Sequence, residues 1–321
     1  WNNLMGESSL QMWTAYPEMI NVTHPYSIRK GTNYVDITVE KQNGGHVDDA
    51  WVTILMDDEI FESRHTNSEG FVRLPINSLE TGEVLVTVTK KNHYPYTSSF
   101  QLYDSGVAVG LVDSPLSIDD DAQGNSNGNG DFIANGGETL EVDVTIKNYG
   151  TEDAVGTVGY LSSNNGSVSI DPSTNPMDFG DMSPGESATS FSPFIITLED
   201  GLADATDLEL TLSFTNSEES PFGSGALNII SSGNALSAVG MDVMGVVGSN
   251  VLEPGETSDI KIELNNSGTT DALSVSGTIT CASPFVEIED ASGTWTIVNS
   301  GESSMNGDDH FQISTLEETI P

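Results

Sequence analysis

Apolar and polar residues alternate along short stretches of the chain, which is the pattern of half-buried β-strands. Clear examples are YVDITVE at residues 34–40 and EVLVTVTK at residues 83–90. Turn signals lie between such stretches, as in NGG at 43–45 and NSEG at 67–70. No long stretch rich in helix-forming residues interrupts them. The pattern predicts an all-β chain built from sandwiches of short strands.

The second half of the chain contains an internal repeat. The stretch GETLEVDVTIKNYGTEDA, which begins at Gly137, aligns without a gap with GETSDIKIELNNSGTTDA, which begins at Gly255. Each copy ends its alternating strand in an Asn-x-Gly turn, where we expect a left-handed glycine. A second shared element, Gly-Glu-Ser, follows at 185–187 and at 301–303. The repeat predicts two sandwiches of the same design.

These patterns predict three tandem immunoglobulin-like β-sandwiches after a short leading segment. The boundaries that we expect are 1–16 for the tail of an upstream domain, 17–105 and 106–232 for two sandwiches, and 233–321 for the third. The third copy ends before any counterpart of DLELTLSFTN at 207–216 or ALNIISS at 226–232. It should therefore lack its last strands, which a continuation of the polypeptide or another chain would supply.

The charge of the chain limits its partners. The 321 residues include 49 Asp and Glu but only 9 Lys and Arg, so the formal net charge is -40. Nucleic acid and anionic membrane surfaces would be repelled, and no stretch of about 18 apolar residues predicts membrane insertion. An acidic chain of this kind suits a saline, calcium-containing extracellular medium.

One acidic segment requires a specific explanation. Residues 118–138 read IDDDAQGNSNGNGDFIANGGE and contain no Lys or Arg. Oxygen-bearing side chains recur there at alternate positions and glycines allow tight folding, which is the ligand chemistry of calcium. The expected ligands are Asp120, Asn125, Asn127, Asp131 and Glu138, together with Asp119, Asp121 and Asn129. The alternative is a flexible linker of similar composition. The corresponding stretch of the third sandwich, GVVGSNVLEPGE, lacks these residues.

Catalytic chemistry finds little support. The single cysteine, Cys281, lies in VSGTITCASP, where we expect a strand and a buried, inert thiol. The five histidines are scattered and form no zinc-binding spacing. The sequence therefore predicts no enzyme activity for this chain.

The order of elements resembles gingipain-type cysteine peptidases, which bacteria export by the type IX route. NLMGESSL at 3–10 with MWT at 12–14 is similar to the segment "NLLGDPSL..WT" that ends the catalytic domain of that family, except that Glu7-Ser8 replaces Asp-Pro. The sandwich from Pro17 resembles the immunoglobulin-like domain that follows. The later sandwiches are similar to tandem acidic modules of secreted bacterial proteins. The resemblance implies a parent cysteine endopeptidase whose catalytic Cys and His lie upstream of Trp1.

Together these patterns predict a non-catalytic, calcium-stiffened spacer or adhesive region, located extracellularly or on the bacterial cell surface. Calcium is expected at the junction of the first two sandwiches. The partners of this region would be the upstream peptidase domain and host or matrix proteins. The alternative is a structural subunit of an extracellular fibre or an adhesin, completed by strands from like chains.

Overall fold

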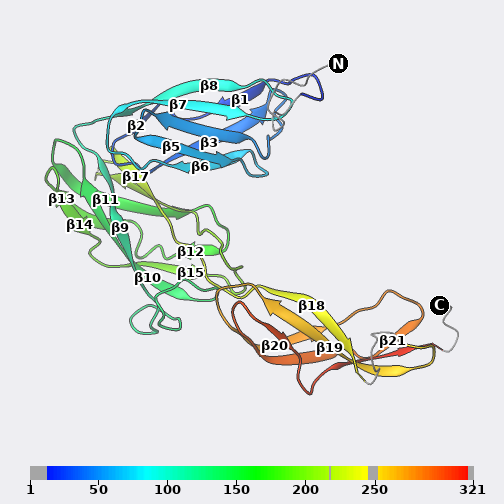
Figure 1. Ribbon diagram of the computed structural model, residues 1–321. Coiled ribbons are helices and arrows are strands. Elements are labelled where there is room, and N and C mark those ends of the chain that lie inside the picture. The colour runs from blue at the N-terminus through cyan, green and yellow to red at the C-terminus, as the bar shows by residue number, and fades with distance from the viewer. Residues whose placement is uncertain (1–12, 217, 245–251, 317–321) are drawn as a thin grey trace, which may run out of the picture.

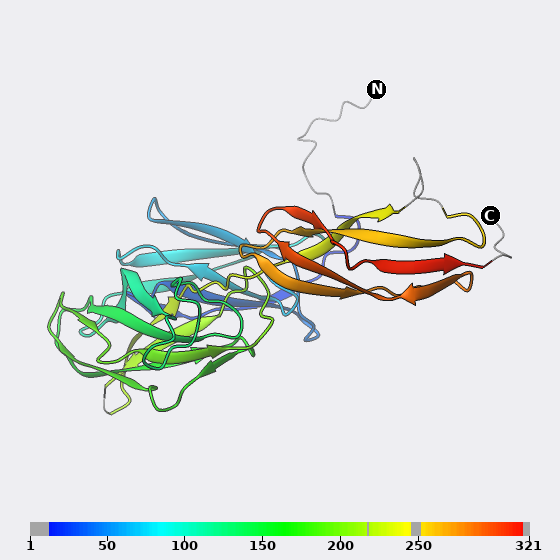
Figure 2. The same cartoon turned by 90° about the horizontal axis from the view of Figure 1, so that it is seen from below.

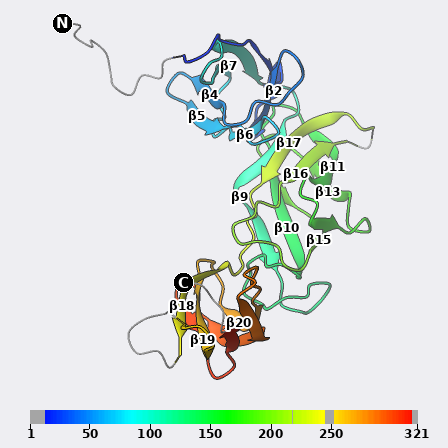
Figure 3. The same ribbon diagram turned by 90° about the vertical axis from the view of Figure 1, so that its right-hand side faces the viewer.

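The computed structural model describes residues 13–216, 218–244 and 252–316. Its described elements are 24 β-strands, and the predicted all-β class is confirmed. The strands form three bodies that follow one another along an elongated molecule (Figures 1 and 3). We call them module 1 (β1–β8), module 2 (β9–β17) and module 3 (β18–β24). Figure 2 shows module 3 extending away from the other two.

Module 1 is a sandwich of a three-stranded sheet, β1-β3-β6, and a five-stranded sheet, β2-β8-β7-β4-β5. Its strands are β1 (Ile20–Thr23), β2 (Ser27–Arg29), β3 (Tyr34–Lys41), β4 (Trp51–Met56), β5 (Ile60–His65), β6 (Phe71–Pro75), β7 (Gly82–Thr89) and β8 (Tyr96–Tyr103). The alternation predicted for β3 and β7 is confirmed, because Val35, Ile37, Val84 and Val86 are buried between the sheets.

Module 2 has the same two-layer design. One sheet has the order β12-β15-β10-β14 with β9 beside β10, and the other has the order β13-β11-β16-β17. Its strands are β9 (Val109–Asp119), β10 (Thr139–Asn148), β11 (Ala154–Ser163), β12 (Val168–Ile170), β13 (Met177–Met182), β14 (Ser187–Thr189), β15 (Phe194–Leu198), β16 (Leu210–Thr215) and β17 (Pro221–Leu227).

Module 3 repeats the first seven strands of module 2 with the same pairing. Its strands are β18 (Leu236–Val243), β19 (Thr257–Asn266), β20 (Ala272–Thr278), β21 (Val286–Asp290), β22 (Ser292–Val298), β23 (Ser303–Met305) and β24 (Phe311–Thr315). β19 pairs with β18, β23 and β24, as β10 pairs with β9, β14 and β15. The second sheet is reduced to β20-β22, and the described residues contain no counterpart of β16 or β17. The predicted lack of the last strands is confirmed.

The two repeated sequence elements meet in space around a buried asparagine. The Asn148 side-chain amide donates to the backbone oxygens of Glu152 (2.8 Å) and Met182 (3.1 Å), and its Oδ1 accepts the N–H of Gly150 (3.0 Å). Its backbone oxygen accepts the N–H of Gly185 (2.8 Å), the first residue of the Gly-Glu-Ser element. Both repeated elements therefore serve one buried hydrogen-bond network.

Asn266 has the same role in module 3. Its amide donates to the backbone oxygens of Thr270 (2.8 Å) and Val298 (3.0 Å), and its Oδ1 accepts the N–H of Gly268 (3.1 Å). Both asparagines are fully buried. We call the buried hydrogen bonds of Asn148, and those of Asn266, the polar clamp of each module. The repeated sequence thus preserves this clamp as well as the alternation of apolar residues.

The prediction that Gly150 and Gly268 are left-handed is wrong. Neither glycine has a positive φ, and the requirement is close packing instead. A Cβ on Gly150 would lie 2.4 Å from the backbone oxygen of Gly106, and one on Gly268 would lie 2.4 Å from that of Gly233. Gly106 and Gly233 lie in the two linkers between modules. Glycine therefore allows each linker to lie directly against the module that follows it.

Candidate metal centre

The acidic segment connects β9 to β10 at the end of module 2 that faces module 3 (Figures 1 and 3). Its backbone forms a bridge with the second linker, because Ser232 donates to Ala134 O (2.8 Å) and Asn135 Nδ2 donates to Ser232 O (3.0 Å). The expected position between the first two sandwiches is therefore wrong. We call the connection between modules 1 and 2 the first joint and that between modules 2 and 3 the second joint. The long strand β9 carries the segment from the first joint to the opposite end of module 2.

Asp120 forms the centre of the loop. Its side chain is fully buried, with Oδ1 accepting the N–H of Phe132 (2.9 Å) and Oδ2 accepting that of Gly130 (3.0 Å). A Cβ on Gly128 would lie 2.9 Å from Asp120 Oδ2, so the residue at this position must be glycine. The loop thus folds around a buried carboxylate.

Glu138 supplies a second buried carboxylate. Its oxygens accept the N–H groups of Asn129 (3.2 Å) and Asn135 (3.0 Å). Burial raises the pKa of Glu138 above its ordinary value, and the charges of Asp120 and Asp131 raise it further, against the lowering effect of those N–H groups. Asp120, Asp131 and Glu138 therefore repel one another, and a cation near them would relieve that repulsion.

The other predicted ligands form the turns of the loop. Asp119, Asp121, Asn129 and Asp131 each accept, through a side-chain oxygen, the backbone N–H two residues further along, at 2.9–3.0 Å. Such closed turns hold a loop in one conformation, so the loop has more local order than the alternative of a flexible linker requires.

Asn125 and Asn127 lie further along the same loop. Asn125 donates its backbone and side-chain N–H groups to Glu141 Oε1, at 2.9 Å and 3.1 Å. Asn127 pairs with Thr139 through two backbone hydrogen bonds, and its side chain is exposed. The eight predicted residues thus share one loop but make different contacts.

The donor set limits how a metal would be held. No group of three or more His, Cys, Asp or Glu side chains converges in a metal-binding arrangement within residues 13–216, 218–244 and 252–316. A calcium ion would need amide and backbone oxygens beside the carboxylates, and this mixed oxygen set is one that calcium accepts. Asp131 is the exposed carboxylate of the predicted ligand set, whereas Asp120 and Glu138 are buried.

The sequence analysis did not identify two residues that are important in this region. Glu141, on β10, holds Asn125, and Asn135 joins Asn129, Glu138 and the linker residue Ser232. The alternating pattern placed Glu141 on a strand, where its position opposite Asp119 depends on pairing register. Only the register reveals that it faces the loop.

The second joint contains further contacts. Asp204 of module 2 accepts hydrogen bonds from the Thr269 hydroxyl and from the backbone N–H of Gly233 (2.9 Å). These hydrogen bonds, first that of Thr269, lower the pKa of Asp204. Thr269 also donates its backbone N–H to Gly233 O (2.8 Å). The linker is therefore bound from both of the modules that it connects.

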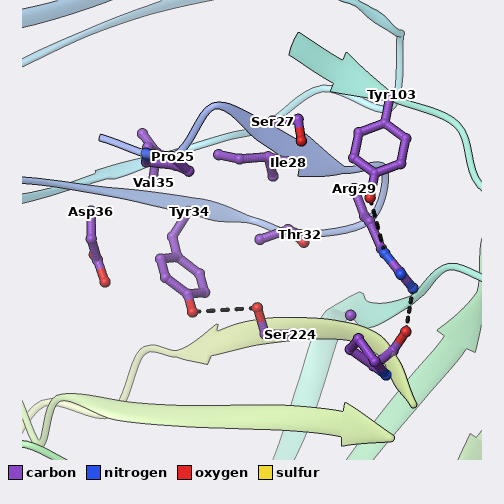
Figure 4. A pocket seen from close by; sticks show the side chains of 12 residues that line it. Pro25, Ser27, Ile28, Arg29, Thr32, Tyr34, Val35, Asp36, Tyr103 and Ser224 are labelled. Carbon is purple, nitrogen blue, oxygen red and sulfur yellow. Dashed lines mark hydrogen bonds between the residues drawn. The ribbon is translucent and has the colours of Figure 1, made fainter. Parts of the chain in front are cut away.

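The first joint encloses a groove of about 470 Å³ between modules 1 and 2 (Figure 4). Arg29 donates to Tyr103 Oη (3.2 Å) and to the backbone oxygen of Pro221. Tyr34 and Ser224 join their hydroxyls at 3.3 Å. Beside the groove, Asn33 forms two hydrogen bonds with the backbone of Ala226 on the edge strand β17, at 2.8 Å and 3.0 Å. Module 1 thus protects an edge of module 2.

Cys281 differs from its prediction. It lies after the end of β20 and its side chain is exposed, whereas we expected a buried strand position. The reason is register: Thr278 pairs with Ser292, the first residue of β22, and Ile279 donates its backbone N–H to Ala291 O (3.0 Å), so Cys281 lies beyond the paired part of the strand. Ser283 donates its backbone N–H to Cys281 Sγ (3.4 Å), and no base contacts the thiol among the interactions of the described residues.

No protein-family model matches the chain, and no curated protein matches it. Among solved structures it is similar to the BSP domain of a biofilm associated protein, with 10% identity and a TM-score of 0.25 over 66% of this chain and 30% of that chain. It is also similar to invasin, a bacterial integrin-binding protein, with 11% identity and a TM-score of 0.23 over 94% of this chain and 55% of that chain.

A third similar structure is the major pilin subunit of Bacillus cereus, with 11% identity and a TM-score of 0.21 over 94% of this chain and 96% of that chain. None of the three names indicates a peptidase. The chain spans only 30% of the biofilm protein structure. Identities and TM-scores this low limit the likeness to the architecture of the fold. No described helix could cross a membrane.

Proposed function

We propose that this chain is a non-catalytic spacer and adhesive region that works outside a bacterial cell and is stiffened by calcium. The observation that carries the proposal is the repeated joint. Thr151 and Thr269 each donate a backbone N–H (2.8 Å) to the linker glycine of their own module, Gly106 or Gly233. Linkers bound in this way resist bending, which is what an arm that holds another domain at a distance requires.

Calcium would stiffen only the second joint and not the first. The carboxylates of the β9–β10 loop repel one another, and the same loop contacts the linker through Asn135. An ion bound by this loop would hold Asn135 in place and with it the start of module 3. The excess of 49 acidic over 9 basic residues suits a medium in which such ions are abundant.

The finer proposal is a parent protein of the gingipain type, exported by the type IX route. It rests on the resemblance of residues 3–14, most of which lie outside the described residues, and of the module that follows them. Sequencing the gene upstream of the codon for Trp1 tests it. We expect an open reading frame that encodes a domain with a catalytic Cys and His, and a frame without one would remove the peptidase from the proposal.

A second function, a subunit of an extracellular fibre, is favoured by the open side of module 3. In module 2 the core continues across β16 and β17 through Leu210, Leu212, Phe214 and Phe222. Among the described residues of module 3, the buried core cluster consists of Ile260, Ala272, Trp295, Val298 and Phe311, which is smaller than that of module 2. β20 pairs only with β22 among the described strands, so its other edge has free backbone groups. A neighbouring chain could add strands there.

A peptide of residues 207–229, which contains β16 and β17, tests this second function. Added to the whole chain, it should raise the melting temperature of module 3 and protect the backbone N–H groups of β20 from hydrogen exchange. A scrambled peptide of the same composition is the control. If both peptides leave module 3 unchanged, the open edge does not accept strands and the fibre reading loses its support.

A further inference from the structure

The outer face of the five-stranded sheet of module 1 has an apolar row across three strands. Leu55 on β4 lies opposite Phe61 on β5 and opposite Leu85 on β7. The residues next to them in sequence, such as Ile54, Ile60 and Val84, point into the core. Leu55, Phe61 and Leu85 therefore point outward together, and they are 38%, 73% and 48% exposed.

Two further cross-strand rows of this outer face contain no Asp or Glu. The next cross-strand row consists of Ser63, Thr53, Thr87 and Thr97, and the row after it contains His65, Trp51 and Thr89. Trp51 is 46% exposed and contacts the His65 ring edge-on. These rows contrast with the net charge of -40 of the chain, but carboxylates border them, because Asp49 lies 2.8 Å from His65 and Glu83 lies on the same side of β7 as Leu85. Exposed apolar patches of this kind mark interaction surfaces.

Carboxylates lie beside the apolar row, at the edge of the sheet where β4 ends and β7 begins. A hollow of about 510 Å³ is lined by Leu55, Met56 and Leu85 and by four acidic residues, Asp57, Glu59, Glu80 and Glu83. Glu83 accepts the Ser99 hydroxyl (2.6 Å) and Glu59 that of Ser78 (3.3 Å). None of the four has a Lys, Arg or His partner within the described part of the chain. The hollow thus combines an apolar floor with unneutralised negative charge.

Charge complementarity selects one class of occupant. A second copy placed face to face would bring two acidic rims together, and an anionic membrane would be repelled. A Lys or Arg side chain can lay its aliphatic stem on Leu55 and Leu85 and direct its charge to the carboxylates. Apolar neighbours of that side chain would then cover Phe61.

We propose that this outer face, defined by Trp51, Leu55, Phe61 and Leu85 and the adjoining acidic hollow, binds a polypeptide segment in which apolar residues are flanked by Lys or Arg. The surface lies on module 1, away from the calcium loop of module 2. Binding here is therefore independent of calcium and of stiffening, and either can fail without the other.

Fluorescence anisotropy of the whole chain with short labelled peptides tests the proposal. A peptide of alternating Leu and Lys should bind, whereas peptides of alternating Ser and Lys or Leu and Glu should bind at least about tenfold more weakly. The double variants Phe61→Ser/Leu85→Ser and Glu80→Gln/Glu83→Gln should each weaken the Leu-Lys peptide by about tenfold or more. All four positions lie on the surface, and far-ultraviolet circular dichroism checks that each variant is folded.

The matched control is Val155→Ser/Tyr160→Ser, which removes exposed apolar side chains from the more acidic module 2. It should bind the Leu-Lys peptide as the unmodified chain does. Equal binding of the Ser-Lys peptide would reduce the interaction to net charge, and equal binding of the Leu-Glu peptide would remove the role of the acidic hollow. Unchanged affinity in both module 1 variants, or an equal loss in the control, would place the interaction elsewhere. Each of these results overturns the proposal.

Discussion

Asn148→Ala is expected to lower the free energy of unfolding of module 2 by about 3–5 kcal/mol. The substitution removes one side chain but leaves the backbone oxygens of Glu152 and Met182 and the N–H of Gly150 without their partner. Because Asn148 is fully buried, water cannot replace these three hydrogen bonds without opening the module. A loss of this size is a large share of the stability of a single domain.

Differential scanning calorimetry of the whole chain provides the measurement. The transition of module 2 should move to lower temperature while that of module 1 stays in place. Asn228→Ala, at an exposed asparagine of the same module, is the matched control and should change stability by no more than about 0.5 kcal/mol. Equal effects of the two substitutions would show that the clamp does not hold the module together.

Calcium is expected to raise the melting temperature of module 2, and a chelator is expected to reverse the rise. For a weak extracellular site with a Kd of about 0.1–1 mM, about 10 mM calcium adds about 1.4–2.7 kcal/mol. For a module of this size that is a rise of roughly 3–10 °C. Asp131→Asn should remove most of the response, because it deletes one carboxylate charge from an exposed position and leaves the buried hydrogen bonds of Asp120 in place.

The pH dependence of module 2 follows from the raised pKa of Glu138. Without calcium, the folded Glu138 holds a proton that the unfolded chain has lost, so the contribution of Glu138 to stability is largest below its ordinary pKa of 4.5 and is lost as the pH rises through the folded pKa. Calcium requires the ionised carboxylate, so its effect should grow over the same window. Glu138→Gln should abolish this pH-dependent loss together with the calcium response.

Asp153→Asn is the control for both calcium substitutions, since it removes the same charge from an exposed position of module 2 outside the loop. Its calcium response should equal that of the unmodified chain. If calcium raises the melting temperature of Asp131→Asn as much as that of Asp153→Asn, the stabilisation is general charge screening and the loop is not the site.

The alternation of apolar residues was sufficient to predict the sandwiches, because strand faces are set by a period of two, and the alignment of the internal repeat predicted the incomplete third copy. Cys281 shows the limit of that signal. Its surroundings resemble a strand in composition, but β20 ends where its partner begins, and this depends on pairing register. Gly150 shows another limit: the sequence marked the need for glycine, but only the position of Gly106 shows that the need is steric.

The position of the acidic loop was wrong for a related reason. The loop follows the first linker closely in sequence, yet β9 spans module 2 and carries it to the second joint. The boundaries at 105/106 and 232/233 lie at the joints, but the hydrogen bonds that hold the joints were missed. Ser-Gly-Val-Ala at 105–108 and Ser-Gly-Asn-Ala at 232–235 share a pattern that could have indicated them. Arg29 and Asn33, in contrast, gave no local signal, because their partners lie far along the chain in module 2.

The most direct test of a calcium-stiffened arm is the distance distribution between spin labels on modules 2 and 3. Cys281 is the only cysteine and is exposed, so one label can occupy it, and Val155→Cys on the surface of module 2 provides the other position. With calcium, double electron–electron resonance should show one narrow distribution that broadens when a chelator is added. Distributions of equal width in both conditions would contradict the account.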